Sequence, residues 1–431
     1  MPRGLTVANL IDRAASRYGD RQFAIRDTPV AYRNLGYGHS GETMTFTEAL
    51  KVANGVAAAL RDRLGVRAGD RIATVLTNVP EQGLFFIAAA RLGAMLTSRN
   101  LLSTVTLSSR MLRLGRKDFG VMALPLAHIF GFTTGVVGGL YSGASGYLMR
   151  FFEPEKVLAA IEKYHATLFM GVPAMYNLML ESHPEKYDLS SMRYWISGAD
   201  AMPVDQIKRF EKLGGRFIEG YGLVETSPII SVNPYFARRH GSVGLPVPGV
   251  KVRVMDENGR MLKRGEVGEF VVRGPNVMKG YWGDGERNAE AFEYGWFHTG
   301  DMGYRDRIGY LYFVDREKDV VKSGSYSVFS REVEEEILRN EKVHEVAIVG
   351  APHPTKGEVP VAFVQLKAGE TATEDELLAW SREHIAGYKA PRQVRIIDEM
   401  PLTMTLKVMK RELRRRLEEE AASGGGGVPP A

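Results

Sequence analysis

The chain has 431 residues, of which 44% are hydrophobic and 25% charged, a balance typical of a protein with a buried core. Its net charge is only +5, and the basic residues are spread along the chain, so charge alone does not predict a nucleic-acid partner. The chain contains no cysteine, which excludes disulfides, thiolate catalysis and cysteine-based metal sites.

The N-terminal segment 1–20 has the pattern of a short amphipathic helix interrupted by charge, and not that of a signal peptide. The longest apolar stretch, 83–90, is closed by Arg91 and is too short to span a bilayer. These features predict a cytoplasmic protein.

The first half of the chain alternates helices and strands. Thr45 and Glu48 have the spacing of a capping box, which opens a helix with apolar residues at helical period: Val52, Ala53, Val56, Leu60 and Leu64. Further helices are expected around 157–161 and at 204–213, and near-continuous apolar strands at 71–76, 167–171, 193–196 and 216–219. Apolar strands separated by amphipathic helices predict a parallel, doubly wound sheet and an α/β fold.

The pattern changes near Val250. Short strands at 251–255, 269–272 and 310–314, with glycine-rich turns and no long helix between them, predict a small β-rich subdomain. A helix at 332–338, strands at 345–349 and 361–366, and a helix after the capping box Thr373-x-x-Glu376 predict a compact α+β domain. The expected organisation is an N-terminal region 1–314 with the β-rich part at 240–314, a hinge at 315–319, a mobile α+β domain at 320–418 and a flexible tail at 419–431.

The segment 219–228, Glu-Gly-Tyr-Gly-Leu-Val-Glu-Thr-Ser-Pro, follows an expected strand. Open α/β sheets bind ligands at the carboxyl ends of their strands, and glycine there allows close approach of the backbone. Tyr221 offers a flat face for a base, and Glu225 is a hard oxygen ligand suited to Mg²⁺. Taken alone, the segment is equally consistent with a tight turn beside a buried tyrosine.

Several strings occur together with this segment and in a fixed order along the chain. They are 197–203, 221–228, 241–244, 274–282, 299–301, 349–354 and 387–391. Together they resemble the adenylate-forming superfamily, and Leu124-Pro-Leu-Ala-His128 resembles its acid–CoA ligase branch. The similarity runs from about residue 5 to residue 418. It implies that a carboxylate is joined to AMP with release of pyrophosphate, and that the acyl group then passes to the thiol of CoA.

The resemblance implies a role for individual residues of the nucleotide site. Adenine would be surrounded by Gly198, Ala199, Asp200, Tyr221 and Gly222. Asp301 would accept hydrogen bonds from both ribose hydroxyls, with Arg316 as a further nucleotide contact. Glu225 would be the Mg²⁺ ligand, and His128 would lie beside the acyl carboxylate, although a structural histidine is the alternative there.

The remaining implied residues belong to the C-terminal part of the chain. Lys407 matches the catalytic lysine, whose ammonium neutralises charge as the carboxylate meets the α-phosphate. Lys318 lies at the hinge about which the small domain rotates between half-reactions. Lys322, Ser323 and Gly324 begin the loop near the expected CoA path. The cofactors and substrates implied are ATP, Mg²⁺, CoA and a carboxylic acid.

The chain also departs from the family pattern. Relatives carry a block with a phosphate-binding loop between the positions of Ala94 and Met95, and roughly 80 residues are missing here by length. Val224 replaces a threonine, Ser325 a glycine, and Leu406 the glycine before the catalytic lysine. A missing phosphate loop removes backbone donors that stabilise the leaving group.

The expected function is an ATP-dependent fatty-acid–CoA ligase for medium- to long-chain acids, with a peripheral membrane contact to collect the fatty acid and no nucleic-acid partner. The missing block supports an alternative, a catalytically impaired descendant that binds adenylates or CoA esters. An acyl-AMP ligase that feeds a carrier protein is a third reading. The basic run that begins at Lys407 is consistent with a solvated terminal helix.

Overall fold

The computed structural model describes residues 6–26, 43–67, 82–85, 87, 98–281, 283–324, 326–403 and 407–422. Contacts divide the chain into two units, and each is described by itself. Unit 1 comprises Met1–Arg253, Val271–His298 and Arg305–Tyr312, and unit 2 comprises Val254–Phe270, Thr299–Tyr304 and Phe313–Ala431. Within the described residues, no helix is both long enough and apolar enough to cross a membrane.

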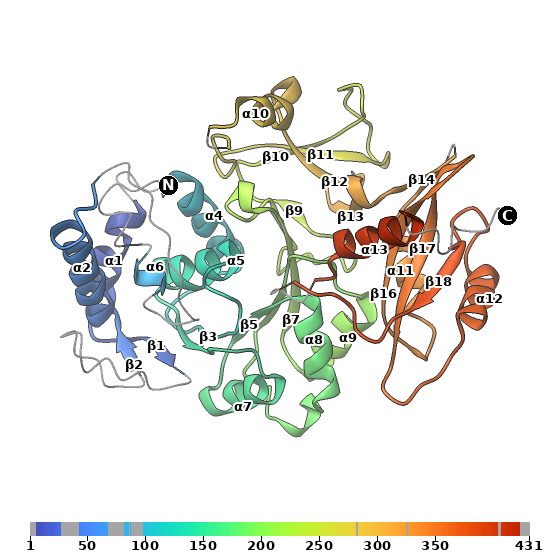
Figure 1. The fold of residues 1–431 in the computed structure, drawn as a ribbon. Helices are drawn as coiled ribbons and strands as arrows, with labels where there is room; N and C mark the ends of the chain where they lie inside the picture. Colours follow the sequence, from blue (N-terminus) through green and yellow to red (C-terminus); the bar gives the residue numbers. More distant parts are fainter. Residues whose placement is uncertain are drawn as a thin grey trace. The chain divides into compact units, whose positions relative to one another are not determined.

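The main sheet lies in unit 1 and has nine strands (Figure 1). They are β1 (Gln22–Arg26), β2 (Thr43–Thr45), β3 (Phe119–Met122), β4 (Ser145–Leu148), β5 (Leu168–Gly171), β6 (Tyr194–Ser197), β7 (Arg216–Tyr221), β8 (Ser231–Val232) and β9 (Leu245–Pro246). Their order is β2-β1-β4-β3-β5-β6-β7-β8-β9. The six strands β1, β4, β3, β5, β6 and β7 pair in parallel with their neighbours in this order. At one edge β2 pairs antiparallel with β1, and at the other edge β8 and β9 pair antiparallel. The α/β fold with a largely parallel sheet is therefore confirmed.

The helices that accompany this sheet are α1 (Val7–Tyr18), α2 (Phe46–Asp62), α4 (Ser98–Met111), α5 (Ile129–Gly131), α6 (Gly138–Ser142), α7 (Pro154–Tyr164), α8 (Pro173–Glu181) and α9 (Val204–Leu213). The capping box before α2 is confirmed, because the Thr45 hydroxyl accepts from the Glu48 N–H at 3.2 Å and the Glu48 carboxylate accepts from the Thr45 N–H at 2.7 Å. Leu64 was expected on this helix but lies beyond its end and is 73% exposed. The strand expected at 71–76 lies outside the described residues.

An aromatic cluster forms part of the core of unit 1. The rings of Tyr176 on α8 and Phe210 on α9 lie 5.0 Å apart, and Phe210 lies 5.0 Å from Trp195 on β6. The Tyr176 hydroxyl donates to the Ile196 carbonyl at 2.8 Å, so the one polar atom of this ring is satisfied within the core. This packing fixes α8 and α9 against the strands β6 and β7, whose carboxyl ends carry the predicted site.

The predicted β-rich region is a four-stranded sheet in the order β10-β11-β12-β13. Its strands are β10 (Lys251–Met255), β11 (Gly268–Arg273), β12 (Phe297–Arg305) and β13 (Leu311–Arg316), and the short helix α10 (Gly285–Ala291) lies between β11 and β12 in the sequence. The sequence predicted β10, β11 and β13 but not β12, because β12 contains the turn-like string His-Thr-Gly-Asp-Met-Gly.

The C-terminal part of unit 2 is the predicted α+β domain. Its strands are β14 (Val321–Ser323), β15 (Tyr326–Val328), β16 (Val343–His353), β17 (Gly357–Leu366) and β18 (Gln393–Ile396), and its helices are α11 (Ser330–Ile337), α12 (Glu374–His384) and α13 (Lys410–Ala422). Figure 1 shows the three helices beside this sheet. α13 continues to Ala422 and thus includes the start of the segment that was expected to be a flexible tail.

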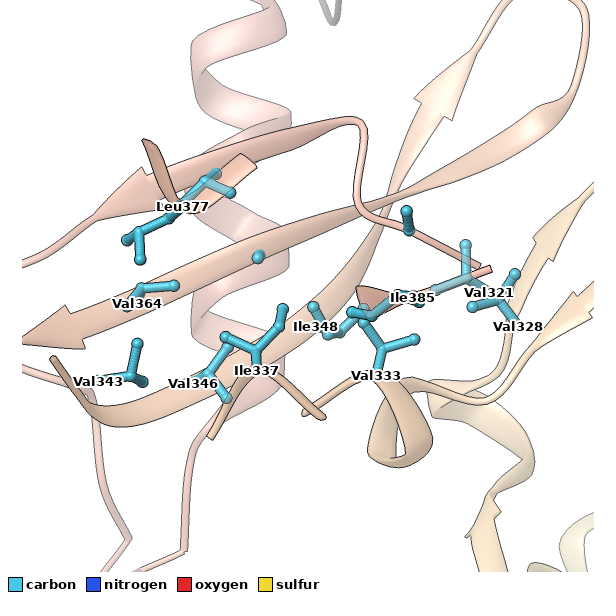
Figure 2. Packing of buried hydrophobic residues seen from close by; sticks show 13 residues of the cluster. Val321, Val328, Val333, Ile337, Val343, Val346, Ile348, Val364, Leu377 and Ile385 are labelled. Carbon is cyan, nitrogen blue, oxygen red and sulfur yellow. The ribbon is translucent and has the colours of Figure 1, made fainter. Parts of the chain in front are cut away.

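The strand β16, at the edge of the sheet beside β17, has buried side chains on both faces, and they alternate between two hydrophobic layers. Val346 and Ile348 belong to the layer that contains Val333 and Ile337 of α11 (Figure 2). Ala347, Val349 and Ala351 belong to the other layer, which contains Leu413 and Leu417 of α13. Because successive side chains of a strand point to opposite faces, the helices α11 and α13 cover opposite faces of one sheet.

Candidate active site

The predicted nucleotide residues of unit 1 gather at the carboxyl ends of the neighbouring parallel strands β6 and β7. Gly198 follows β6 almost directly, and a Cβ on it would lie 3.3 Å from the carbonyl oxygen of Gly220 on β7. Ala199 has φ +74°, in the left-handed region that residues other than glycine rarely adopt, and the Asp200 carboxylate accepts from the Ala201 N–H at 2.9 Å. Backbone strain of this kind is concentrated at ligand-binding loops.

The loop after β7 folds tightly back on itself. Tyr221 is the last residue of β7, and its carbonyl accepts from the Ile230 N–H at 2.8 Å. A Cβ on Gly222 would overlap the Pro228 carbonyl, so this position requires glycine for close approach of two backbone segments. The Thr226 hydroxyl accepts from the Leu223 N–H at 2.9 Å and donates to the Pro228 carbonyl at 3.2 Å, which fixes the loop that carries Glu225.

His128 lies on the same edge of the sheet, shortly after β3. It is partly buried, and its Nδ1 accepts from the Phe130 N–H at 3.2 Å at the start of α5, so the neutral ring carries its proton on Nε2. A Cβ on Gly198 would lie 3.4 Å from the Phe130 ring. The structure therefore brings the His128 segment next to the Gly198 loop, and it also gives His128 a structural task as a helix cap.

Glu225 is held by a residue for which the sequence had suggested no role. The Tyr281 hydroxyl donates to Glu225 Oε1 at 3.1 Å, and the Glu225 carbonyl accepts from the Met278 N–H at 2.7 Å. Burial and then the Glu225 carboxylate raise the pKa of Tyr281 above 10.0, so the phenol keeps its proton and remains a donor at neutral pH. The only sequence signal for Tyr281 was its place in the string 274–282.

The donor set around Glu225 fits a magnesium ion that is bound together with a nucleotide. Mg²⁺ prefers hard oxygen ligands and usually binds through one or two carboxylates plus phosphate oxygens. The described residues contain no group of three or more His, Cys, Asp or Glu side chains that would hold a metal alone. Val224, which replaces the family threonine, is 59% exposed beside Glu225.

Asp301 and Arg316 are brought together within unit 2. Asp301 lies on β12 with its side chain only 6% exposed, and Arg316 at the end of β13 approaches it with Nε 3.7 Å from Oδ1. The Asp301 N–H donates to the Thr299 hydroxyl at 3.1 Å, which in turn donates to the Phe270 carbonyl at 2.7 Å. These contacts hold an acidic acceptor and a guanidinium side by side, and an ionised carboxylate is a strong hydrogen-bond acceptor.

The expected hinge residue Lys318 is exposed, but the backbone around it is bound to α13. Arg414 donates to the Lys318 carbonyl at 2.8 Å and to the Asp319 carboxylate at 2.7 Å. The carboxylate of Asp319 is largely buried, with 11% of its side chain exposed. Arg414 therefore attaches the last residues of the hinge segment to the C-terminal domain.

Of the residues predicted near the CoA path, Lys322 and Ser323 lie on β14, which pairs with β15 and β17, and Gly324 follows directly. The Lys322 N–H donates to the Glu358 carboxylate at 3.1 Å, and the Gly324 N–H donates to the Lys356 carbonyl at 2.7 Å. Ser323 is buried, and Gly324 has φ +62°, which favours glycine. Ser325 lies outside the described residues.

Lys407 lies shortly before α13. Its N–H donates to the Thr403 hydroxyl at 3.1 Å, and its carbonyl accepts from the Thr403 N–H at 2.8 Å. Leu402 and Val408 form an antiparallel bridge. Leu406, which replaces the family glycine, lies outside the described residues.

Two family models match the chain. The model "AMP-binding enzyme" matches residues 11–96 and 93–282, and the model "AMP-binding enzyme C-terminal domain" matches residues 332–407. The two segments of the first match meet at 93–96, which includes the junction between Ala94 and Met95 where the sequence predicts a missing block. The junction itself lies outside the described residues.

Similar proteins include a long-chain-fatty-acid–CoA ligase of Bacillus subtilis (strain 168), 38% identical over 74% of this chain and 58% of that protein. A feruloyl-CoA synthase of Amycolatopsis sp is 39% identical over 75% of this chain and 67% of that protein. The chain thus spans less than two thirds of the length of the fatty-acid ligase that it matches.

The crystal structure of ATP-bound MatB from Rhodopseudomonas palustris has the same fold, with a TM-score of 0.85 and 26% identity. That similarity covers 96% of this chain and 99% of the MatB chain. The family models together cover most of the chain, in the order in which the motifs occur in the sequence. The chain therefore belongs to the AMP-binding enzyme family.

Proposed function

We propose that the chain is an ATP-dependent acid–CoA ligase, which forms an acyl-adenylate and then transfers the acyl group to CoA. The observation that carries this proposal is the packing of the Gly198 loop against Gly220 at the carboxyl ends of β6 and β7. Ligands of open α/β sheets bind at this edge, and two glycines there leave the backbone accessible to a flat base. Tyr221 at the end of β7 would stack on that base.

In this proposal the other site residues serve the phosphates and the acid. Glu225 would hold Mg²⁺, which neutralises charge on the phosphate oxygens when it is bound. The His128 Nε2–H would donate to the acyl carboxylate and orient it toward the α-phosphate. Lys407 would bring its ammonium to the same point during adenylate formation. Lys322, Ser323 and Gly324 would line the approach of CoA in the second step.

Asp301 gives a prediction that concerns the nucleotide alone. Replacing Asp301 with alanine is expected to weaken ATP binding by about tenfold, because a carboxylate that accepts two hydroxyl protons is lost. The same change should abolish the preference for ATP over 2′-deoxy-ATP, which calorimetry with both nucleotides measures. Asp398→Ala, an exposed change in the same unit, is the control. A variant that still discriminates the two nucleotides as the parent does would contradict the assignment.

The acid that we propose is a medium- to long-chain fatty acid, because fatty-acid ligases recur among the relatives. An aromatic acid is the second candidate, because feruloyl-CoA synthase is equally similar. Gly131 and Gly135, which follow His128, give no support to either acid, because neither needs an acyl chain to explain it. A Cβ on Gly131 would lie 2.5 Å from the Pro125 carbonyl oxygen, and a Cβ on Gly135 would overlap the Met122 side chain. Packing thus explains both glycines without an acyl pocket.

The test is AMP release from ATP with a panel of fatty and hydroxycinnamic acids, measured with and without CoA. We expect CoA-dependent AMP release and acyl-CoA formation, with kcat/KM higher for fatty acids than for ferulate. A higher kcat/KM for ferulate would reassign the acid and leave the ligase intact. Transfer to a carrier protein in place of CoA would identify an acyl-AMP ligase.

The predicted loss of the phosphate-binding block favours a second candidate function, a protein that binds adenylates or CoA esters without turnover. Each lost backbone donor would cost about 10²–10³ in rate. A folded chain that binds an acyl-AMP analogue but releases no AMP from ATP would establish this alternative. A chain that turns over ATP only when acid and CoA are present would exclude it.

A further inference from the structure

The contact between Tyr281 and Glu225 joins two segments that are far apart in the chain. The hydroxyl and carboxylate are 3.1 Å apart, and the residues are separated by 56 positions. Both side chains are partly buried. A hydrogen bond to a charged acceptor contributes more than one between neutral groups, and it also restricts the rotation of the carboxylate. The contact holds Oε1 of Glu225 on the side of the Tyr281 hydroxyl.

Tyr281 is itself held by Asn288 on α10. The Tyr281 N–H donates to Asn288 Oδ1 at 2.6 Å, and the Asn288 amide donates back to the Tyr281 carbonyl at 2.8 Å. Gly280, with φ +143°, allows this close approach, since a Cβ there would lie 2.8 Å from Asn288 Oδ1. Asn288 thus fixes the backbone of Tyr281 through both of its polar groups.

The ring of Tyr281 is fixed as well. The guanidinium carbon of Arg287 lies 3.7 Å from the ring centroid, a stacked cation–π contact. The segment 278–281 contacts Glu225 at two points. The Met278 N–H donates to its carbonyl, and the Tyr281 hydroxyl donates to its carboxylate. Oε2 of Glu225 has no hydrogen-bond partner among the described residues, so one oxygen of the carboxylate is oriented and the other remains available for a ligand.

We propose that Tyr281 is a positioning residue that orients Glu225 toward the magnesium ion of a bound nucleotide. The inference rests on the proposed function, because it assumes a magnesium–nucleotide ligand. Groups that orient a metal ligand through hydrogen bonds commonly change metal affinity by about 10- to 100-fold when they are removed. Tyr281 would act through Glu225 and would not itself contact the metal.

The test compares Tyr281→Phe with the parent by calorimetry, using a non-hydrolysable ATP analogue in saturating Mg²⁺ and in EDTA. The parent is expected to bind more tightly with Mg²⁺. In Tyr281→Phe, affinity with Mg²⁺ should fall about tenfold while affinity in EDTA stays within twofold. Binding of Mn²⁺ to the protein–analogue complex, followed by electron paramagnetic resonance, should weaken by a similar factor.

Tyr310→Phe is the matched control. It removes the same hydroxyl from unit 1, where Tyr310 donates to the Ala237 carbonyl away from Glu225. A purely structural role for Tyr281 predicts that Tyr281→Phe loses the same affinity with Mg²⁺ as in EDTA, and that result would overturn the inference. Tyr310→Phe should leave the Mg²⁺ dependence unchanged. An unchanged Mg²⁺ dependence in Tyr281→Phe would overturn it too, while the proposed function would stand. A parent that binds no nucleotide would overturn both.

Discussion

Replacing Lys407 with alanine is expected to slow acyl-adenylate formation by about 100- to 1,000-fold. The ammonium group would neutralise charge where the carboxylate meets the α-phosphate, and preorganised charge of this kind is worth factors of this size. The backbone of residue 407 makes both hydrogen bonds to Thr403, so alanine can keep them. Exchange of pyrophosphate into ATP, dependent on the acid, measures this step alone.

The second half-reaction provides the internal control for Lys407. With a synthetic acyl-adenylate and CoA, the variant should form the thioester within about threefold of the parent rate, because no pyrophosphate leaves in that step. Arg411→Ala, which removes an exposed positive charge on α13, should change neither half-reaction. Equal loss in both half-reactions would assign Lys407 to the fold of the loop and not to the chemistry.

Lys410→Met is expected to lower the free energy of unfolding by about 3–5 kcal/mol, because it leaves a buried carboxylate without its partner. Lys410 Nζ lies 2.7 Å from Glu334 Oε1, and only 17% and 15% of the two side chains are exposed. The same carboxylate accepts from the Ile348 N–H at 2.7 Å, so the pair joins α13, α11 and β16. Urea unfolding of unit 2, followed by circular dichroism, measures the loss.

A double variant, Lys410→Met with Glu334→Leu, should recover part of that loss, since an apolar pair replaces the two charges while the Ile348 N–H loses its acceptor. Lys342→Met breaks an exposed pair with Glu376 in the same unit and should cost less than about 1 kcal/mol. A double variant as unstable as Lys410→Met would show that packing and not charge compensation is responsible.

The loss in Lys410→Met should also depend on pH. Burial raises the pKa of Glu334 above 4.5, and Lys410 opposes that rise. Without Lys410, the pKa of Glu334 in the folded state rises further, while its pKa in the unfolded state stays near 4.5. The folded state therefore binds a proton more tightly than the unfolded state. Stability relative to the parent should therefore improve as pH falls from about 8 toward about 5.5. A deficit independent of pH would contradict this origin.

Local signals allowed much of the fold to be predicted. The capping boxes at Thr45 and Thr373 specify helix starts through residues three positions apart, and both are present. β12 was missed because its glycine and aspartate residues are typical of turns, and only pairing with distant strands makes it extended. Leu64 fits the helical period but follows the end of α2. The prediction placed it on the helix because periodicity alone does not specify where a helix ends.

The candidate site was predictable as individual residues but not as a set of contacts. Motifs named Glu225 and Lys318, yet the residues that contact them lie far away in the sequence. Tyr281 is 56 positions from Glu225, and Arg414 is 96 positions from Lys318. Such pairs depend on the path of the chain through both sheets. Single-sequence reasoning can therefore name a candidate site residue before it can name the residue that contacts it.

The alternation of β16 between two hydrophobic layers restricts how this part of the gene can change in length. Deleting one residue within 345–351 would turn every following side chain of the strand to the opposite face. Residues of the Val346 and Ile348 layer would then exchange places with those of the Ala347, Val349 and Ala351 layer. From Glu345 to His353 each residue of β16 pairs with one residue of β17, so a deletion here would also shift the register of that pairing. Homologous chains should accordingly accept insertions and deletions in the turn at 354–356, and not within 345–351.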